Sequence, residues 1–512
     1  MTDITSNNKR IAKNTLFLYL RMLIVMPVSI YTSRVVLNTL GVGDYGIYNV
    51  VGGIVMTLGV LNGALSSSTS RFLTYELGKK DMDTLKKTFS SSLNLHIITA
   101  LIVVLLAETI GLWFFYNKLV IPAERIDAAF WVYQFSILTT VFTFTQIPYN
   151  ASLISHENMS IYAYVGLYDA FSKLAIVYVI TISPIDTLVF YALLLMINSI
   201  LVQIFYRYYT YAKYEECRFR LIKDWVLYKR LLSYSGWELF GGVASVSQGQ
   251  GINILLNIFY GPTVNAARAI AYQIQNSVNL FIENFLMATR PQVIKNYADG
   301  NYDEMYNLTF KAAKYSYFLM LALILPIAFE LRFILNLWLG NAYPEDTYIF
   351  TLIILAFSLT EIFHSALIMP FHAIGKMKLG NSLNGTIMIL SLPISYIVLK
   401  AGASAYVVFL VLIITNVIVT CNGWLIVRHY VWFNVLNFAR NVLWRCIIVT
   451  VFAFITPTLI TYYMKDGCTR FFLLGFATEI SLAIISYQLG LNSNEKKDIQ
   501  QIVKIKLSKL IP

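Results

Sequence analysis

Charged residues are scarce in this sequence of 512 residues: 13% are Asp, Glu, Lys or Arg, and 57% are hydrophobic. Soluble domains carry roughly 25% charged residues. The charges present could not cover the surfaces of the several soluble domains that a chain of this length would form. This scarcity excludes an ordinary soluble protein and favours a chain immersed in lipid.

Motifs for catalysis and for nucleotide or metal binding are also lacking. The sequence has no Gly-rich loop followed by Lys, as in ATPases, and no paired-His metalloprotease motif. The four cysteines show no metal-ligand spacing, and we do not expect a disulfide framework. Asp81-Met82-Asp83 resembles a two-acid motif that holds a metal and a nucleotide sugar, but no nucleotide-binding domain surrounds it. We therefore expect no metal site, no cofactor and no enzymatic activity.

Long apolar runs are what the sequence has instead. A helix that spans a bilayer needs about 20 apolar residues. Runs without any Asp, Glu, Lys or Arg include 128–155, 187–206, 379–399 and 401–427. Reading the other apolar stretches in the same way predicts an all-α integral membrane protein with about fourteen transmembrane helices.

Basic residues are distributed unevenly between the predicted loops. With both termini placed in the cytoplasm, most of the 39 Lys and Arg residues fall in cytoplasmic segments, as the positive-inside rule requires. They are spread over many short loops, so the net charge of +12 reflects membrane topology, and we expect no nucleic-acid partner. Membrane lipids are the expected surroundings.

Two stretches of the chain resemble each other and predict an internal duplication. RVVLNTLG (34–41) corresponds to NILLNIFYG (253–261), and Arg71 corresponds to Arg290 within the helices that follow. The copies begin at the first and seventh spans, an even spacing, so both face the same way as a parallel repeat. The prediction is an N-lobe at 1–215, a C-lobe at 216–435, and two extra helices with a basic tail at 436–512. Two pseudo-symmetric six-helix lobes would then face each other across a central cavity.

Polar side chains line one face of the helices that open each lobe. Ionisable groups at bilayer depth are costly and usually face a cavity or a partner. The eighth span carries a stripe at helical spacing: Asn265, Arg268, Tyr272, Asn276, Asn279, Glu283 and Arg290. The seventh span adds Glu238, Gln250, Asn253 and Asn257. The second span adds Asn49 and Asn62, and the first adds Arg21 and Arg34.

Two interpretations of these polar residues stand side by side. A single Asn or Ser is commonly a helix–helix contact, Arg21 could reach back to the cytoplasmic interface, and Arg34 and Arg268 could lie at the outer interface. The stripe as a whole favours a hydrated cavity. Asp169 and Lys173, four residues apart with the acid first, are expected to neutralise each other.

The opening run NTLFLYLRMLIVMPVSIYTSRVVLNTLGVGDYGIYNVVGGIV (14–55) resembles Wzx-type polysaccharide-unit flippases. So do GQGINILLNIFYGPTVNAARAIAYQIQNSV (249–278) and TRPQVIKNYADG (289–300). These flippases belong to the multidrug/oligosaccharidyl-lipid/polysaccharide (MOP) exporter superfamily. The resemblance covers essentially the whole chain and implies a MATE-like fold that alternates between inward-open and outward-open states.

The resemblance also implies a cargo, an undecaprenyl-diphosphate-linked oligosaccharide moved from the cytoplasmic to the periplasmic leaflet of a bacterial inner membrane for O-antigen or capsule synthesis. Basic cavity residues would hold the diphosphate: Arg21, Arg34, Arg71, Arg268 and Arg290. The Asn, Gln and Tyr residues of the polar faces would bind the glycan. Other membrane proteins of polysaccharide assembly are the partners that this role allows.

Two other functions compete with this one. Several drug and cation antiporters of the superfamily use an acid in the first span, where this chain has Arg21. Glu238 and Glu283 nevertheless keep an ion-coupled multidrug antiporter open, with a proton or a sodium ion as the coupling ion. A membrane-embedded glycan enzyme is the third candidate, and the short loops argue against it.

Overall fold

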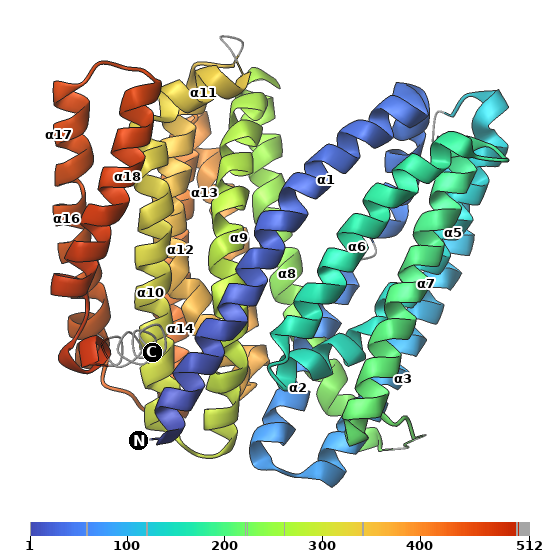
Figure 1. The fold of residues 1–512 in the computed structure, drawn as a ribbon, viewed down its shortest axis with the longest axis horizontal. Coiled ribbons are helices and arrows are strands. Elements are labelled where there is room, and N and C mark those ends of the chain that lie inside the picture. The colour runs from blue at the N-terminus through green and yellow to red at the C-terminus, as the bar shows by residue number, and fades with distance from the viewer. Residues whose placement is uncertain are drawn as a thin grey trace, which may run out of the picture. The chain divides into compact units, whose positions relative to one another are not determined.

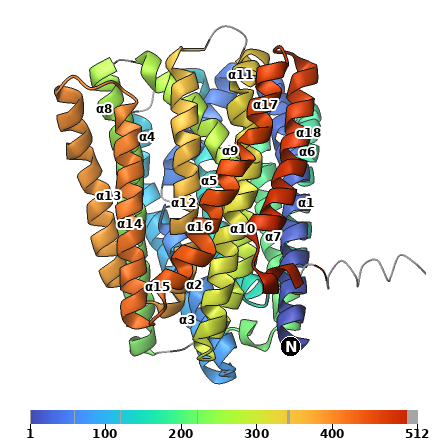
Figure 2. The same cartoon turned by 90° about the vertical axis from the view of Figure 1, so that its left-hand side faces the viewer.

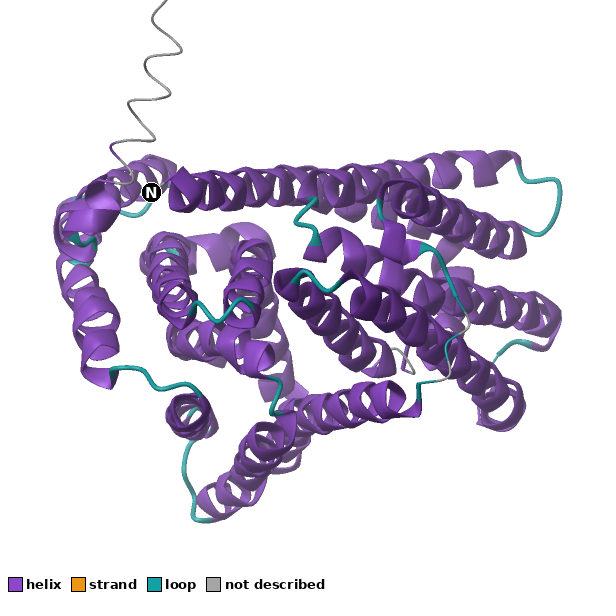
Figure 3. Cartoon of the chain, turned by 90° about the horizontal axis from the view of Figure 1, so that it is seen from below, coloured by secondary structure: helices purple, strands orange, loops and turns teal. Residues whose placement is uncertain are grey.

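The computed structural model describes residues 2–57, 60–118, 121–220, 222, 224–260, 262–339, 343–497 and 500. Within these ranges the chain is helical and contains no β-strand, as Figure 3 shows. The predicted all-α class is confirmed. The four cysteines are free thiols.

The first part of the chain forms helices α1 to α8, which are coloured from blue to green in Figure 1. Their bounds are α1 (Thr2–Thr57), α2 (Val60–Lys79), α3 (Met82–Leu106), α4 (Leu112–Lys118), α5 (Ile126–Ser155), α6 (Met159–Val179), α7 (Thr187–Lys213) and α8 (Trp225–Tyr260). Short turns of other helix types connect them: η1 (Ala107–Gly111), η2 (Ala123–Arg125), η3 (Ile180–Ile182) and η4 (Glu215–Cys217).

The second part continues with long helices and ends with shorter ones. Their bounds are α9 (Pro262–Ala298), α10 (Tyr302–Phe329), α11 (Leu331–Leu339), α12 (Asp346–Ile374), α13 (Met377–Lys400), α14 (Val407–Tyr430), α15 (Val435–Phe438), α16 (Trp444–Ala453), α17 (Ile455–Tyr463) and α18 (Cys468–Ile485). The π-helical turns η5 (Ala439–Leu443) and η6 (Ser486–Gly490) lie before α16 and after α18.

Eleven helical segments of the described chain are long and apolar enough to cross a membrane, from Arg10–Ser29 to Cys468–Gly490. The protein is therefore a multi-pass membrane protein. Of the three further spans that the sequence predicts, the second includes residues outside the described ranges, and the seventh and eighth do not reach this level of hydropathy. They fall on helices as well, in the second half of α1 with α2, and in α8 and α9. The polar faces of the seventh and eighth spans lower their hydropathy.

Although α1 has no break over its 56 residues, the chain reverses direction near Asp44. The Tyr31 hydroxyl lies 2.9 Å from that of Tyr178, at the end of α6. Val51, by contrast, packs against Val132 in the first turns of α5. The first half of α1 thus runs along α6 toward one end of the helices, and the second half returns along α5. A straight helix of this length would measure roughly 84 Å, far more than a bilayer needs.

The chain divides into two compact units. One comprises Arg10–Gly242, and the other comprises Val243–Pro512 with Met1–Lys9. The predicted lobe boundaries at 215/216 and 435/436, and the predicted central cavity between the lobes, stay predictions.

Each unit has its own apolar core. In the unit of Arg10–Gly242, Phe89 and Leu153 are fully buried and pack with Tyr149 between α3 and α5. In the other unit, Phe350 of α12 packs against Phe409 of α14, with ring centres 4.7 Å apart. Packing in these cores positions the helices whose polar side chains are described below.

The last helices, α16 to α18, lie beside α10, as Figure 2 shows. Two buried ion pairs join them to it. Lys314 of α10 donates to Glu495, which follows η6, over 2.5 Å. Arg470 of α18 forms two hydrogen bonds with Glu330, at the end of α10, at 2.7 and 2.9 Å. Because both pairs are buried, they fix the register of the C-terminal helices against α10.

Candidate functional site

A cavity of about 340 Å³ lies among α9, α10 and α12, inside the second unit. Helical spacing explains its polar lining, because residues 279, 283 and 290 fall on one face of α9. The same holds for residues 358, 361 and 365 of α12. The polar lining residues are Asn279, Glu283, Arg290, Ser358, Glu361 and Ser365. The structure therefore brings together three residues that the sequence had placed on one stripe.

Glu361 is the main residue of this cavity that the sequence analysis did not select. Asn279 and Glu283 of α9 line the same space. One turn before Asn279 on α9, Gln275 donates a hydrogen bond to the hydroxyl of Ser358 on α12, at 2.9 Å. The spacing of Ser358, Glu361 and Ser365 was visible in the sequence as a second polar stripe. What the sequence did not contain was the packing of α12 against α9.

Arg268, on the same helix α9, is held by neutral groups. Its Nη2 donates to the carbonyl oxygen of Gly249 at 2.9 Å, and its Nη1 donates to Oδ1 of Asn253 at 3.3 Å. Its guanidinium carbon lies 4.2 Å from the centre of the Tyr272 ring. Asn265 also donates to Asn253, at 2.8 Å. Four predicted cavity residues thus form one network between α8 and α9.

In the first unit, Arg21 of α1 packs against α6. Its guanidinium carbon lies 4.7 Å from the centre of the Tyr162 ring. The Nε atom is buried and has no hydrogen-bond partner among the described residues. Two turns further along α6, Asp169 pairs with Lys173 at 2.7 Å and accepts from Asn198 at 2.8 Å. The expected Asp169–Lys173 pair is confirmed, and both Asp169 oxygens are engaged by groups other than Arg21.

Arg71 occupies an aromatic setting in the same unit. It is buried on α2, with its guanidinium carbon 4.6 Å from the Phe72 ring centre and 4.7 Å from that of Tyr75. The ring of Tyr234, on α8, lies 5.8 Å away. Glu238, one turn beyond Tyr234, accepts a hydrogen bond from the Ser67 hydroxyl at 3.0 Å. Glu238 therefore has a place in the contacts between α8 and α2, and it does not line the cavity that holds Glu283.

For the remaining predicted site residues, the structure gives burial alone or does not describe the side chain. Gln250 and Asn276 are exposed, and Asn62 is half-buried. The side chains of Arg34, Asn49 and Asn257 lie outside the part of the chain whose side chains the structure describes. Within the described residues, no group of three His, Cys, Asp or Glu side chains is arranged to hold a metal ion.

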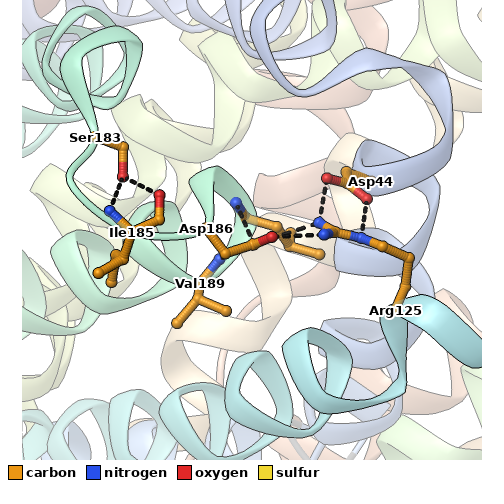
Figure 4. Close-up of polar contacts among 7 residues, drawn as sticks. Asp44, Arg125, Ser183, Ile185, Asp186 and Val189 are labelled. Atoms are coloured by element: carbon orange, nitrogen blue, oxygen red, sulfur yellow. Dashed lines mark hydrogen bonds and ion pairs between the residues drawn. The ribbon is translucent and has the colours of Figure 1, made fainter.

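Two other arginines are neutralised by carboxylates. Arg125 forms ion pairs with Asp44 and Asp186, as Figure 4 shows, and Arg470 is paired with Glu330. None of the ion pairs among the described residues includes Arg21 or Arg268. These two arginines therefore carry positive charges that the described carboxylates leave unpaired.

Asp186 lies in the loop before α7 and joins three segments of the first unit. Partial burial opposes its ionisation, but hydrogen bonds from Arg125 and from the amides of Val189 and Leu188 outweigh that effect and hold the pKa of Asp186 below its usual value. Because Arg125 also binds Asp44, the reversal of α1 is tied to the starts of α5 and α7.

Comparison with solved structures shows the fold. The chain matches an outward-facing multidrug resistance MATE family transporter of the MOP superfamily with a TM-score of 0.70 and 15% identity, over 81% of this chain and 95% of that one. The chain has the fold of the MOP superfamily transporters. A MATE structure in the straight conformation matches equally well, with a TM-score of 0.70 and 15% identity over 83% and 96% of the two chains.

A third structure with this fold is a MOP superfamily transporter from Pyrococcus furiosus. It matches with a TM-score of 0.68 and 15% identity, over 81% of this chain and 95% of that one. It is described as having a binding pocket of reverse polarity that suggests a different function. No protein-family model and no curated protein sequence matches the chain. The predicted MATE-like fold is confirmed, and at this level of identity the likeness concerns the fold alone.

Proposed function

We propose that this protein is a flippase that moves an undecaprenyl-diphosphate-linked oligosaccharide across the bacterial inner membrane for surface-polysaccharide synthesis, with both of its termini in the cytoplasm. The observation that carries the proposal is the setting of Arg21 and Arg268. Each guanidinium stacks on a tyrosine ring, and neither forms an ion pair with a described carboxylate.

The chemistry of arginine makes this setting informative. A guanidinium stays charged in proteins, and an unpaired charge at membrane depth is costly. An anionic cargo would supply the missing counter-charge. A diphosphate suits this role, because the fork of N–H groups on arginine matches the oxygens of a phosphate. Arg34, Arg71 and Arg290 are further candidates for the same group.

The first span itself argues against a cationic cargo. Between Arg10 and Ser29 the chain has no Asp or Glu, and its central ionisable residue is Arg21. The first acid that follows, Asp44, is paired with Arg125. The helices that carry Arg21 and Arg268 therefore offer no carboxylate next to either arginine that could receive an organic cation.

Neutral polar groups would receive the sugars. Asn253 and Asn265 stand beside Arg268, and Asn279, Ser358 and Ser365 line the cavity between α9 and α12. Asn and Ser side chains both donate and accept hydrogen bonds, as sugar hydroxyls require. The polyprenyl tail would remain in the lipid while the lobes alternate between the two open states.

The second candidate is an ion-coupled multidrug antiporter. One observation favours it: Glu283 and Glu361 line a single cavity in the second unit. Two carboxylates in one site suit a proton, a sodium ion or an organic cation. The similar structures include a multidrug resistance transporter, which fits this candidate. In the flippase proposal, the same two acids serve the coupling ion.

Transport by the purified protein in lipid vesicles separates the two candidates. A fluorescent undecaprenyl-diphosphate oligosaccharide is placed in the outer leaflet, and its loss of accessibility to a membrane-impermeant reductant is followed over time. In parallel, uptake of a fluorescent organic cation is measured under a proton or a sodium gradient. The flippase proposal requires movement of the lipid. Movement of the cation alone would overturn the proposal in favour of the antiporter.

A further inference from the structure

Gly166 of α6 makes room for the guanidinium of Arg21. A Cβ atom placed on Gly166 would lie 2.2 Å from Arg21 Nε, 2.9 Å from Cζ and 3.0 Å from Cδ. Real Cβ atoms do not approach other heavy atoms so closely, so any larger residue at position 166 would displace the arginine. The absence of a side chain at this one position leaves the space that the guanidinium fills.

This contact differs from the other close approaches at glycines of the described chain. Gly380, Gly423 and Gly490 make room for Phe371, Leu367 and Phe318, which are apolar core side chains. At Gly111 the neighbour is the hydroxyl of Tyr133. Gly166 differs from these four because it stands against a charged side chain, and packing of an apolar core does not explain it.

The residues around Gly166 fix the orientation of Arg21. Tyr162, four residues earlier on α6, provides the ring on which the guanidinium stacks. Asp169, three residues later on the same helix, is engaged by Lys173 and Asn198. Arg21 therefore lies against α6 with its Nε buried next to Gly166, without an ion pair that would neutralise it.

We propose that Gly166 is a positioning residue for anion binding, which holds the Arg21 guanidinium flat against α6 so that its charge serves the diphosphate of the cargo. This inference rests on the proposed function, because it assigns Arg21 to the substrate. It extends that proposal to a residue without a functional group of its own.

Gly166→Ala tests the proposal without endangering the fold. The atoms that the new methyl group would meet belong to a flexible arginine side chain, which can move away, and Ala is favoured over Gly inside a helix. Gly236→Ala is the matched control, because a Cβ at Gly236 of α8 meets no atom within 4 Å. Thermal unfolding of the ligand-free proteins in detergent checks that both variants are folded.

The measurement is the affinity of the purified protein for undecaprenyl diphosphate, determined in both the wild-type and the Arg21→Ala background. We expect Gly166→Ala to weaken binding about tenfold when Arg21 is present and less than about twofold when position 21 is Ala, since residues that act through one another are not additive. Gly236→Ala is expected to change affinity in neither background.

Each other outcome has a defined meaning. Equal weakening by Gly166→Ala in both backgrounds, or no weakening in either, would overturn the role of Gly166 while leaving Arg21 in place as the anion-binding residue. Unchanged binding in the Arg21→Ala protein itself would overturn the proposed role of Arg21, and with it the reason for positioning that side chain.

Discussion

The guanidinium carbon of Arg268 lies 4.2 Å from the centre of the Tyr272 ring, one helical turn further along α9. The ring supports the charge without neutralising it, and Gly249 and Asn253 accept its hydrogen bonds. The charge is thus oriented by neutral groups on α8 and α9.

Replacing Arg268 should affect the cargo more than the fold. Hydrogen bonds to charged groups contribute about 1.5–3 kcal/mol, so Arg268→Ala is expected to weaken diphosphate-lipid binding by about 10- to 100-fold. Arg268→Lys keeps the charge but loses the fork and the stacking, and should recover only part of the affinity. Titration with undecaprenyl diphosphate measures both. Full recovery by Lys would show that charge alone matters.

Tyr272 offers a finer test of the same site. Tyr272→Phe keeps the ring beneath Arg268 and should bind the diphosphate lipid nearly as well as the wild type. Tyr272→Leu removes the ring and should weaken binding by about 0.5–2 kcal/mol, the range of a cation–π contact. Equal affinities of the Phe and Leu variants in the same titration would contradict a role for the ring.

Glu361 is expected to serve the coupling ion and not the diphosphate. Glu361→Gln should reduce the stimulation of lipid movement by a proton or sodium gradient, while the affinity for undecaprenyl diphosphate stays within about twofold of the wild-type value. Glu479→Gln, in α18, is the matched control, because Glu479 does not line the cavity. A gradient response that persists in Glu361→Gln and disappears in Glu479→Gln would contradict this assignment.

The buried pair of Lys314 and Glu495 should matter for stability. Changing one partner leaves an unpaired buried charge, so Lys314→Met or Glu495→Met is expected to destabilise the protein by about 3–5 kcal/mol. The double variant Lys314→Met/Glu495→Met removes both charges and should recover most of that loss. Unfolding in detergent, followed by tryptophan fluorescence, measures the difference. A double variant as unstable as the sum of the singles would contradict mutual neutralisation.

Acid should weaken the contact of Arg125 with Asp186. The pKa of Asp186 is lowered in the folded protein, so its contribution to stability is present above the unfolded-state pKa and is lost as pH falls through the lower folded-state value. Stability is therefore expected to fall when the pH drops below about 4. Asp186→Asn should cost about 0.5–1 kcal/mol at neutral pH and show a smaller loss in acid. Identical acid profiles of the two proteins would contradict the assignment.

Much of the fold was predictable because the bilayer imposes strong constraints on composition. Apolar runs such as 187–206 and 401–427 predicted α7 and α14, and the spacing of Asp169 and Lys173 predicted their ion pair. Both inferences depend only on local periodicity.

The candidate site was predictable only along single helices. The stripe of Asn279, Glu283 and Arg290 followed from the spacing of α9, but the contribution of Glu361 depends on which helix packs beside it. The contact of Gly166 with Arg21 was likewise invisible, because the space beside a glycine is known only when the neighbouring side chain is known. Tertiary packing, not residue type, decided both.

The central claim is that Arg21 and Arg268 hold the diphosphate of a lipid-linked oligosaccharide during its passage. The most direct measurement is the rate at which a fluorescent undecaprenyl-diphosphate oligosaccharide crosses the bilayer of vesicles containing the wild type, Arg21→Ala, Arg268→Ala or the exposed control Arg440→Ala. We predict that the wild type and Arg440→Ala move the lipid at similar rates, and that each of the other two variants slows it at least about tenfold at equal incorporation. Equal rates for all four proteins would contradict the claim.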